Sequence, residues 1–148
     1  MLAFRTAAAA DVPLLIEMMI DFNRGEGISW TPERGEPALR RLVGDPSLGV
    51  IGLACDSDAV VGYFILTWGY DLEWNGRDSF LTELYLVPSV RRRGLGRELL
   101  AGAEKAARAN GARALHLMVR HENSPAIALY QGAGYVSPDR YFMSKPFA

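Results

Sequence analysis

The sequence predicts a mixed α/β fold of the α+β type, with helices and strands in a single domain that spans residues 1–148. This length suits one compact domain with a sizeable core. Hydrophobic residues make up 49% and charged residues 22% of the chain, the balance of an ordinary globular protein. Strand-like and helix-like apolar patterns follow one another in the order ββ, then βαβ, then αβ, which is typical of one mixed α/β domain.

A short strand and two helices are expected at the start of the chain. The strand covers residues 2–7. A helix capped by Asp11 follows to about residue 23, because its apolar residues recur at helical spacing. The glycines and prolines of residues 24–37 predict a loop, and a second helix is expected over residues 36–45.

Three strands are expected next. Residues 48–55 and 59–68 are apolar runs separated by "DSDA", which predicts a hairpin turn. Residues 69–78 form a polar stretch and are expected to be a loop. Residues 79–87 alternate in the manner of a third strand.

A helix, a strand, a short helix and one or two last strands complete the expected order. The first of these helices begins near Gly94, and residues 113–119 predict a buried strand. The short helix lies in residues 123–134, with Asn123 or Ser124 as its N-cap. Residues 134–145 are expected to form the last one or two strands. The longer helix presents one apolar stripe: Leu95, Leu99, Leu100, Ala103 and Ala107.

Composition argues against several classes of protein. The net charge of −1 provides no positive field that would recruit nucleic acid or an anionic membrane. The single cysteine, Cys55, excludes an internal disulfide and leaves no thiolate cluster for a metal, so no metal is expected. The first residues lack a basic segment ahead of an apolar run, and the longest apolar run is residues 59–68, too short to span a bilayer. A cytoplasmic protein is expected.

Arginines and glycines crowd the start of the longer helix, in "LTELYLVPSVRRRGLGRELL", residues 81–100. A helix N-terminus has unpaired N–H groups and a positive dipole end, so it binds anions. Glycines let a ligand approach the backbone, and arginines suit phosphate. The pattern fits neither a Walker loop nor a dinucleotide fingerprint. It predicts a phosphate cradle, with a solvated basic turn as the alternative.

Two motifs resemble those of a known family. The string "RRRGLG" fits the Arg/Gln-x-x-Gly-x-Gly/Ala signature of the GNAT superfamily of N-acetyltransferases, and "NSPAIALYQGAGY" is similar to its later motif. The resemblance implies a mixed, mostly antiparallel central sheet of six to seven strands, flanked by about four helices. It also implies an acyltransferase that moves the acetyl group of acetyl-CoA, its co-substrate, directly to an amine. A weaker likeness points to small polyamine or thialysine acetyltransferases.

By the same resemblance, three groups of residues would hold acetyl-CoA. A strand would bond the pantetheine arm and acetyl carbonyl through its backbone, the arginine–glycine turn would hold the pyrophosphate, and the later helix would contact the CoA arm. These residues are Leu84, Tyr85 and Leu86; Arg91, Arg92, Arg93, Gly94, Leu95, Gly96 and Arg97; and Asn123 and Ala126.

Tyr130 and Glu83 are the candidate catalytic residues. The resemblance places Tyr130 near the thioester sulfur, where a phenol of reference pKa about 10 can protonate the leaving thiolate. The alternative is a core tyrosine. Glu83 is expected on the strand face opposite Leu84 and Leu86, beside the acetyl site. It is the base that takes the amine proton, directly or through water, or a ligand of the amine, or else a structural carboxylate. His116 is expected to be a core histidine.

Aromatic and acidic residues from two segments are expected to converge on the acceptor, if the GNAT plan holds. Such a lining suits a cationic amine, and a solvated loop is the alternative. These residues are Phe22, Asn23, Glu26 and Trp30, then Tyr70, Asp71, Glu73 and Trp74. A small primary amine is the expected acceptor. Acetylation of a protein lysine or N-terminus, and a non-catalytic CoA-binding module for sensing or assembly, are the competing interpretations. The resemblance also suggests a homodimer.

Overall fold

One sheet organises the first of the two compact units into which the chain divides, Met1–Met118 and Val119–Ala148. The computed structural model describes residues 1–147. Elements of the first unit are β1 (Ala3–Thr6), α1 (Val12–Glu26), α2 (Pro32–Gly44), β2 (Gly49–Asp56), β3 (Ala59–Asp71), β4 (Gly76–Leu86), α3 (Leu95–Ala109) and β5 (Leu115–Leu117). Short 3₁₀ turns cover Ala9–Asp11 and Pro88–Val90.

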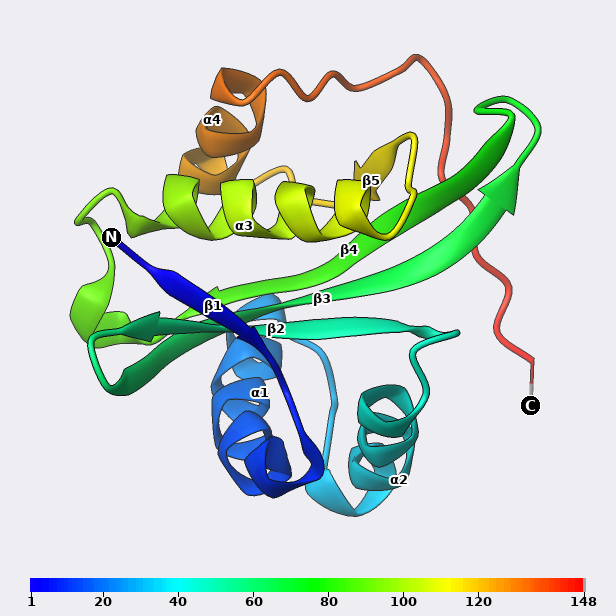
Figure 1. Cartoon of the computed structure of the whole chain (residues 1–148). Helices are drawn as coiled ribbons and strands as arrows, with labels where there is room; N and C mark the ends of the chain where they lie inside the picture. The colour runs from blue at the N-terminus through cyan, green and yellow to red at the C-terminus, as the bar shows by residue number, and fades with distance from the viewer. Residues whose placement is uncertain (148) are drawn as a thin grey trace. The chain divides into compact units, whose positions relative to one another are not determined.

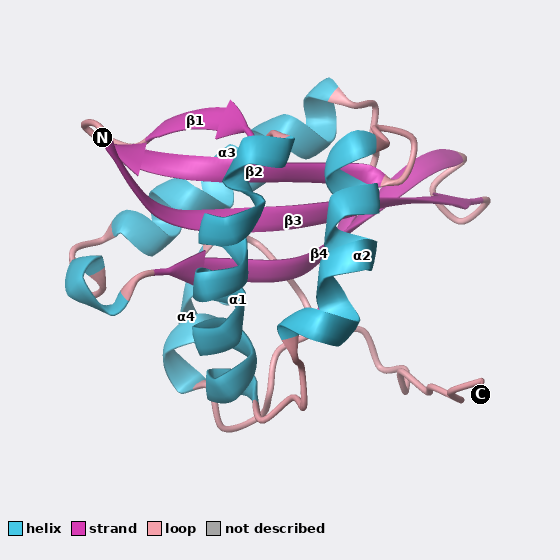
Figure 2. Cartoon of the chain, turned by 90° about the horizontal axis from the view of Figure 1, so that it is seen from below, coloured by secondary structure: helices cyan, strands magenta, loops and turns pink. Residues whose placement is uncertain are grey.

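The strands lie in the order of the sequence, β1-β2-β3-β4-β5. The first four pair antiparallel, and β5 pairs parallel to β4. A parallel neighbour requires a crossover connection, which α3 provides. Helices α1 and α2 cover one face of the sheet and α3 covers the other (Figures 1 and 2). The sheet is therefore the middle of three layers in this unit.

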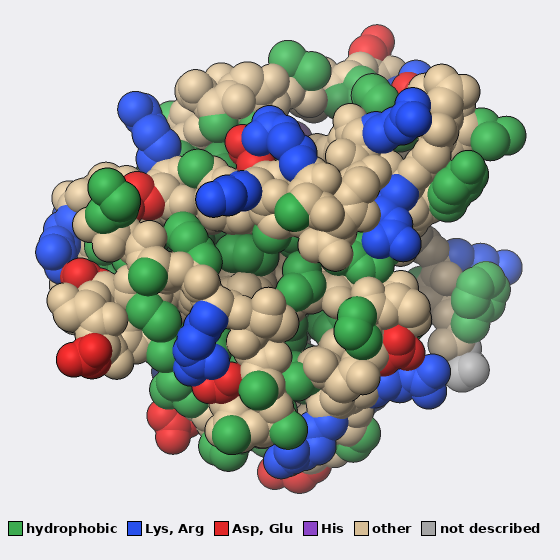
Figure 3. All heavy atoms as spheres, viewed as in Figure 1, with side chains coloured by type: hydrophobic (Ala, Val, Ile, Leu, Met, Phe, Trp, Pro, Cys, Tyr) green, Lys and Arg blue, Asp and Glu red, His purple; other side chains and the backbone are tan. Residues whose placement is uncertain are grey.

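Charged side chains are interspersed on the molecular face drawn in Figure 3, where Lys and Arg alternate with Asp and Glu. No extended patch of one sign gathers on that face. This distribution agrees with the net charge of −1.

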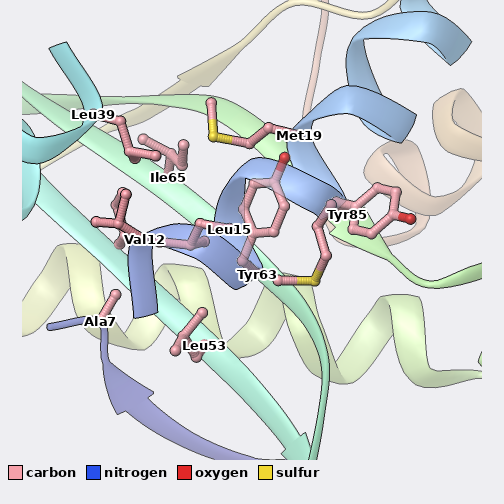
Figure 4. Close-up of a cluster of buried hydrophobic side chains, with 11 residues drawn as sticks. Ala7, Val12, Leu15, Met19, Leu39, Leu53, Tyr63, Ile65 and Tyr85 are labelled. Carbon is pink, nitrogen blue, oxygen red and sulfur yellow. The ribbon is translucent and has the colours of Figure 1, made fainter. Parts of the chain in front are cut away.

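Two apolar layers hold the first unit together. On the α1 and α2 face, Leu15 and Leu53 are fully buried beside Tyr63 (Figure 4). On the α3 face, the five residues of the predicted stripe are all buried. The confirmed stripe follows from helical periodicity, which brings every third or fourth residue onto the sheet.

Several predicted elements are confirmed within a residue or two, including β1, β2, α3 and the hairpin turn after β2. The loop predicted over residues 24–37 is wrong in extent. Helix α1 continues to Glu26, and α2 begins at Pro32, where a proline's missing N–H costs nothing. The loop predicted over residues 69–78 is also wrong, because β3 and β4 continue to a turn at residues 72–75.

The predicted cap by Asp11 is wrong as well. Its carboxylate makes a two-point contact with Arg5 at 2.8 Å and accepts the N–H of Ala8 at 2.8 Å, with no side-chain cap on α1. The Arg5 guanidinium lowers the pKa of Asp11 to about 2. Asp11 therefore joins β1 to the start of α1.

The second unit contains α4 (Ser124–Gly132). As predicted, Asn123 caps this helix, since its Oδ1 accepts the N–H of Ala126 at 3.3 Å. The strands predicted over residues 134–145 are not found in the described chain, whose sheet has five strands rather than six to seven. Pro138 lacks the N–H that a strand ladder requires and interrupts the predicted segment.

We expect Leu15→Ala to lower the free energy of unfolding by about 2–5 kcal/mol, because it leaves a cavity under α1. The neighbouring Leu14 is 36% exposed, whereas Leu15 is fully buried. Leu14→Ala is therefore the matched control and should cost less than about 1 kcal/mol. Urea denaturation of both variants measures the difference, and equal losses would contradict the placement of α1.

Candidate active site

A β-bulge in β4 sets the geometry of the site. Ile65 of β3 pairs with Glu83, but the next residue, Leu66, pairs with Leu81, so Thr82 is the extra residue. Side chains alternate along a strand, and an extra residue reverses the alternation beyond it. Leu81 therefore faces α3 together with Leu66. Glu83, two residues later, faces α1 and α2.

Glu83 is a partly buried carboxyl group with a single hydrogen-bond partner among residues 1–147. Its Oε2 accepts the hydroxyl of Tyr63 at 2.7 Å. Burial raises the pKa of Glu83 to about 7, and the hydrogen bond from Tyr63 opposes this rise. No fully buried side-chain nitrogen or oxygen in the described chain lacks a partner, so the second oxygen of Glu83 is not fully enclosed. The group can therefore exchange a proton near neutral pH.

A second set of contacts lies beside this pair. The rings of Tyr63 and Tyr85 stack, with centroids 5.5 Å apart. The Tyr85 hydroxyl donates to Asp21 Oδ2 of α1 at 2.7 Å, and Arg91 approaches the same oxygen at 3.4 Å. Burial and the bond to Asp21 raise the pKa of Tyr85 to about 12. Strand β4 is thus tied both to α1 and to the arginine-rich turn.

The arginine side chains of the turn contact the protein itself. Arg91 donates from Nε to the Leu86 carbonyl at 2.8 Å and lies over the Tyr85 ring. Arg93 lies 3.7 Å from Asp56 at the end of β2. These contacts hold the turn against the ends of two strands.

The first turn of α3 has no side-chain cap and open space beside it. Gly94 is its N-cap in the left-handed region, at φ 80°, and no side chain caps the helix. A Cβ on Gly94 would meet no atom within 4 Å, so there is open space at this point. The N–H groups of Leu95 and Gly96 open the helix and have no carbonyl one turn earlier to bond. Arg97, in contrast, donates its N–H to the Gly94 carbonyl at 3.2 Å.

The acceptor residues predicted on α1 and after it lie against the core. Phe22 and Trp30 are partly buried against the cluster under α1 and α2. Asn23 is 4% exposed and donates its amide to the Met19 carbonyl, so its side chain supports the helix. Glu26 is the last residue of α1.

The other predicted acceptor residues lie at the tip of the β3–β4 hairpin. Tyr70 is 77% exposed, and Asp71 accepts the N–H of Glu73 within the turn. Asp71 is six residues beyond Ile65, the partner of Glu83, which corresponds to roughly 20 Å along the strand. Figures 1 and 2 both show this hairpin projecting beyond α1 and α2. The hairpin tip therefore does not lie beside Glu83, and a shared mouth with the residues on and after α1 stays a prediction.

Three further predicted residues have clear local roles. His116 of β5 pairs with Asp78 at 3.0 Å and lies 5.8 Å from both the Trp74 and Phe80 rings, which agrees with a structural histidine. In the second unit, Asn123 caps α4, and the Tyr130 ring lies edge-on to Tyr135 at 5.9 Å. The catalytic and cofactor roles of Tyr130, Asn123 and Ala126 stay predictions.

Among residues 1–147, no group of three or more His, Cys, Asp or Glu side chains is placed to hold a metal ion. Within the same range, every helix is too short or too polar to cross a membrane.

The chain belongs to the acetyltransferase (GNAT) family, whose pattern it matches over residues 15–135. It is 34% identical over 86 residues to the uncharacterized N-acetyltransferase YhfO of Bacillus subtilis (strain 168). The aligned residues cover 58% of each chain. It is 32% identical over 75 residues to the thialysine N-epsilon-acetyltransferase of Bos taurus, covering 51% of this chain and 44% of that one. The matched region thus spans about half the length of these curated relatives.

A solved structure agrees in fold over nearly the whole chain. The integron cassette protein HFX_CASS3, from the mobile metagenome of Cole Harbour Salt Marsh, is 29% identical, with a TM-score of 0.85. The match covers 98% of this chain and 90% of that one.

Sequence reasoning missed two residues of the site, Tyr63 and Asp21. Tyr63 stood within an apolar run and Asp21 on the polar side of a helix, and neither belongs to a motif. The available signal was weak. Tyr63 is the one polar-tipped side chain in the middle of "VVGYFIL", and a buried tyrosine hydroxyl usually has a partner.

The pKa of Glu83 predicts how stability changes with pH. The folded chain keeps this proton up to about pH 7, whereas the ordinary value is 4.5. Between these values the folded state binds more protons than the unfolded state, so the free energy of unfolding falls as pH rises. Glu83→Gln should remove that fall and be more stable than wild type near pH 8, on the order of 1–3 kcal/mol.

Urea denaturation near pH 5 and near pH 8 measures this effect. Glu33→Gln, at an exposed position on α2, is the control and should keep the wild-type dependence on pH. If Glu83→Gln also keeps it, the carboxyl group is not buried as described.

Proposed function

We propose that this protein is an N-acetyltransferase that transfers the acetyl group of acetyl-CoA to a primary amine of a small molecule. One observation carries the proposal: the β4 bulge turns Glu83 into a partly buried position with a pKa of about 7. The same strand leads through Pro88–Val90 to the uncapped N-terminus of α3. A proton acceptor and an anion site therefore belong to one continuous segment, and family membership supports this interpretation.

The residues present fit the phosphate groups of CoA. Unpaired N–H groups at the start of a helix and its positive dipole end favour an anion, and Gly94 leaves space beside them. Arg92 and Arg97 add positive charge near this turn. By the family resemblance, the backbone of Leu84 to Leu86 would hold the pantetheine arm and the acetyl carbonyl.

Acetyl transfer to an amine requires two proton movements. The amine must lose a proton as its nitrogen attacks the thioester carbon, and Glu83, with one oxygen not fully enclosed, would accept that proton directly or through water. The C–S bond then breaks, and the sulfur takes up a proton. Tyr130 would donate it, on the strength of the family resemblance alone.

The acceptor amine would enter near the end of α1. The partly exposed Phe22 and Trp30 would offer aromatic surface there, and Glu26 would offer negative charge. This combination suits an ammonium group on an alkyl stem. The bovine and mouse relatives are named thialysine N-epsilon-acetyltransferases, so we propose an amino-acid-like side-chain amine as the first class to test.

Binding of acetyl-CoA should raise the melting temperature by mass action, and NAD or ATP should have little effect. Gly94→Val should abolish the rise, because a branched side chain at a left-handed residue distorts the turn and covers its N–H groups. Gly111→Val is a matched control, since Gly111 also has a positive φ (84°) and open space but follows the other end of α3. A full rise in Gly94→Val would place the anion site elsewhere.

Release of the CoA thiol should be observed with at least one small primary amine from a panel that includes polyamines, amino acids and lysine peptides. On that amine, Tyr130→Phe should lower kcat by about 10²-fold, the loss expected for a general acid. The control is Tyr135→Phe, which changes the ring beside Tyr130. Turnover with peptides alone would favour a protein acceptor. Binding of acetyl-CoA without any turnover would favour a non-catalytic module.

A further inference from the structure

The hydroxyl of Tyr63 is the group that fixes the candidate base. It donates to Glu83 Oε2 at 2.7 Å from the neighbouring strand, β3, and Tyr63 itself is fully buried. We infer that Tyr63 is a positioning residue, which orients the Glu83 carboxylate and stabilises its ionised form for the reaction. This inference rests on the proposed function for its catalytic meaning, although the effect on Glu83 can be measured without catalysis.

The surroundings of Tyr63 leave its ring little freedom. The ring stacks on Tyr85 at an interplanar angle of 28° and lies among Leu15, Met19 and Ile65 (Figure 4). A hydroxyl on so constrained a ring can point in few directions. It therefore holds one carboxylate oxygen in place, and the other oxygen is not fully enclosed.

Tyr63 also keeps its phenolic proton and is therefore always a hydrogen-bond donor. Burial, with the nearby negative charge of Glu83, raises the pKa of Tyr63 well above its usual range, so the phenol keeps its proton throughout the working pH range. A hydrogen bond donated to a carboxylate favours the charged form. Burial acts in the opposite direction on Glu83, and the balance of the two sets the pH at which the group ionises.

Three other charged or titratable groups lie around this pair. They are Tyr85 on β4, Asp21 on α1 and Arg91 of the turn, which contact one another. Glu83 itself is influenced by burial and by Tyr63. The structure therefore offers a natural control: Tyr85 is stacked on Tyr63 but gives its hydroxyl to Asp21 instead of Glu83.

The test compares Tyr63→Phe with Tyr85→Phe in the full chain. We expect Tyr63→Phe to move the titration of Glu83, followed by ¹³C NMR of side-chain carboxyl groups and assigned with Glu83→Gln, upward by about one pH unit or more. The acidic limb of the pH–rate profile should move by the same amount, with KM for acetyl-CoA unchanged. Tyr85→Phe should leave the Glu83 titration near its wild-type position.

The two measurements separate the two hypotheses. An unmoved Glu83 titration in Tyr63→Phe overturns the inference, whatever the kinetics show. A moved titration with an unmoved rate profile supports the contact but removes Glu83 as the base in the proposed function. If Tyr63→Phe does not fold, fluorotyrosine at position 63 serves instead. Its more acidic phenol is a stronger donor and should move the titration downward, and no movement would again overturn the inference.

Discussion

The bulge at Thr82 is the constraint on which the candidate site depends. Without it, Glu83 would follow Leu81 on the face covered by α3, where the apolar stripe of that helix would bury a carboxylate with no partner. With the bulge in place, the buried side chains before it pack in the α3 layer and those after it pack in the α1 and α2 layer. Leu81 completes the α3 layer, and Glu83 and Tyr85 join Tyr63 under α1. The bulge thus accommodates Thr82 while Leu81 and Glu83 stay on opposite faces of the sheet.

Placing a carboxyl group there costs stability, and the surrounding residues reduce that cost only in part. A buried carboxylate without hydrogen bonds is strongly unfavourable, so the group responds by holding its proton to a higher pH. The hydrogen bond from Tyr63 limits the rise, which leaves the pKa near 7 rather than far above it. A fully paired or fully exposed glutamate would ionise well below neutral pH and be a weaker base. The intermediate environment suits proton transfer near neutrality.

Local signals in the sequence predicted a large part of the fold. The stripe on α3, the hairpin after β2 and the cap at Asn123 all depend on residues close together in the chain. Contacts between distant residues were not predictable in this way. The Tyr63–Glu83 hydrogen bond joins residues that are 20 positions apart in the sequence, and the Tyr85–Asp21 hydrogen bond joins residues that are 64 positions apart. The polar residues 69–78 predict a loop, because residues 69–75 at the tip of the hairpin are exposed and lack the apolar alternation of a half-buried strand.

The crowding of arginines before α3 is explained mainly by contacts within the protein. Arg91 bonds the Leu86 carbonyl and Asp21, and Arg93 pairs with Asp56, so these side chains brace the turn against β4, α1 and β2. The turn needs such support, because Arg92 and the N-cap Gly94 both adopt positive φ. A non-glycine residue in that region is strained by about 1–2 kcal/mol. Anion binding would then depend chiefly on backbone N–H groups, held in place by arginines whose own charges are partly neutralised.

A chain of contacts also links this turn to Glu83. Arg91 contacts Tyr85, Tyr85 stacks on Tyr63, and Tyr63 donates a hydrogen bond to Glu83. The side chain that supports the proposed anion site therefore also contacts the tyrosine pair beside the proposed base, and movement of the turn would affect both places.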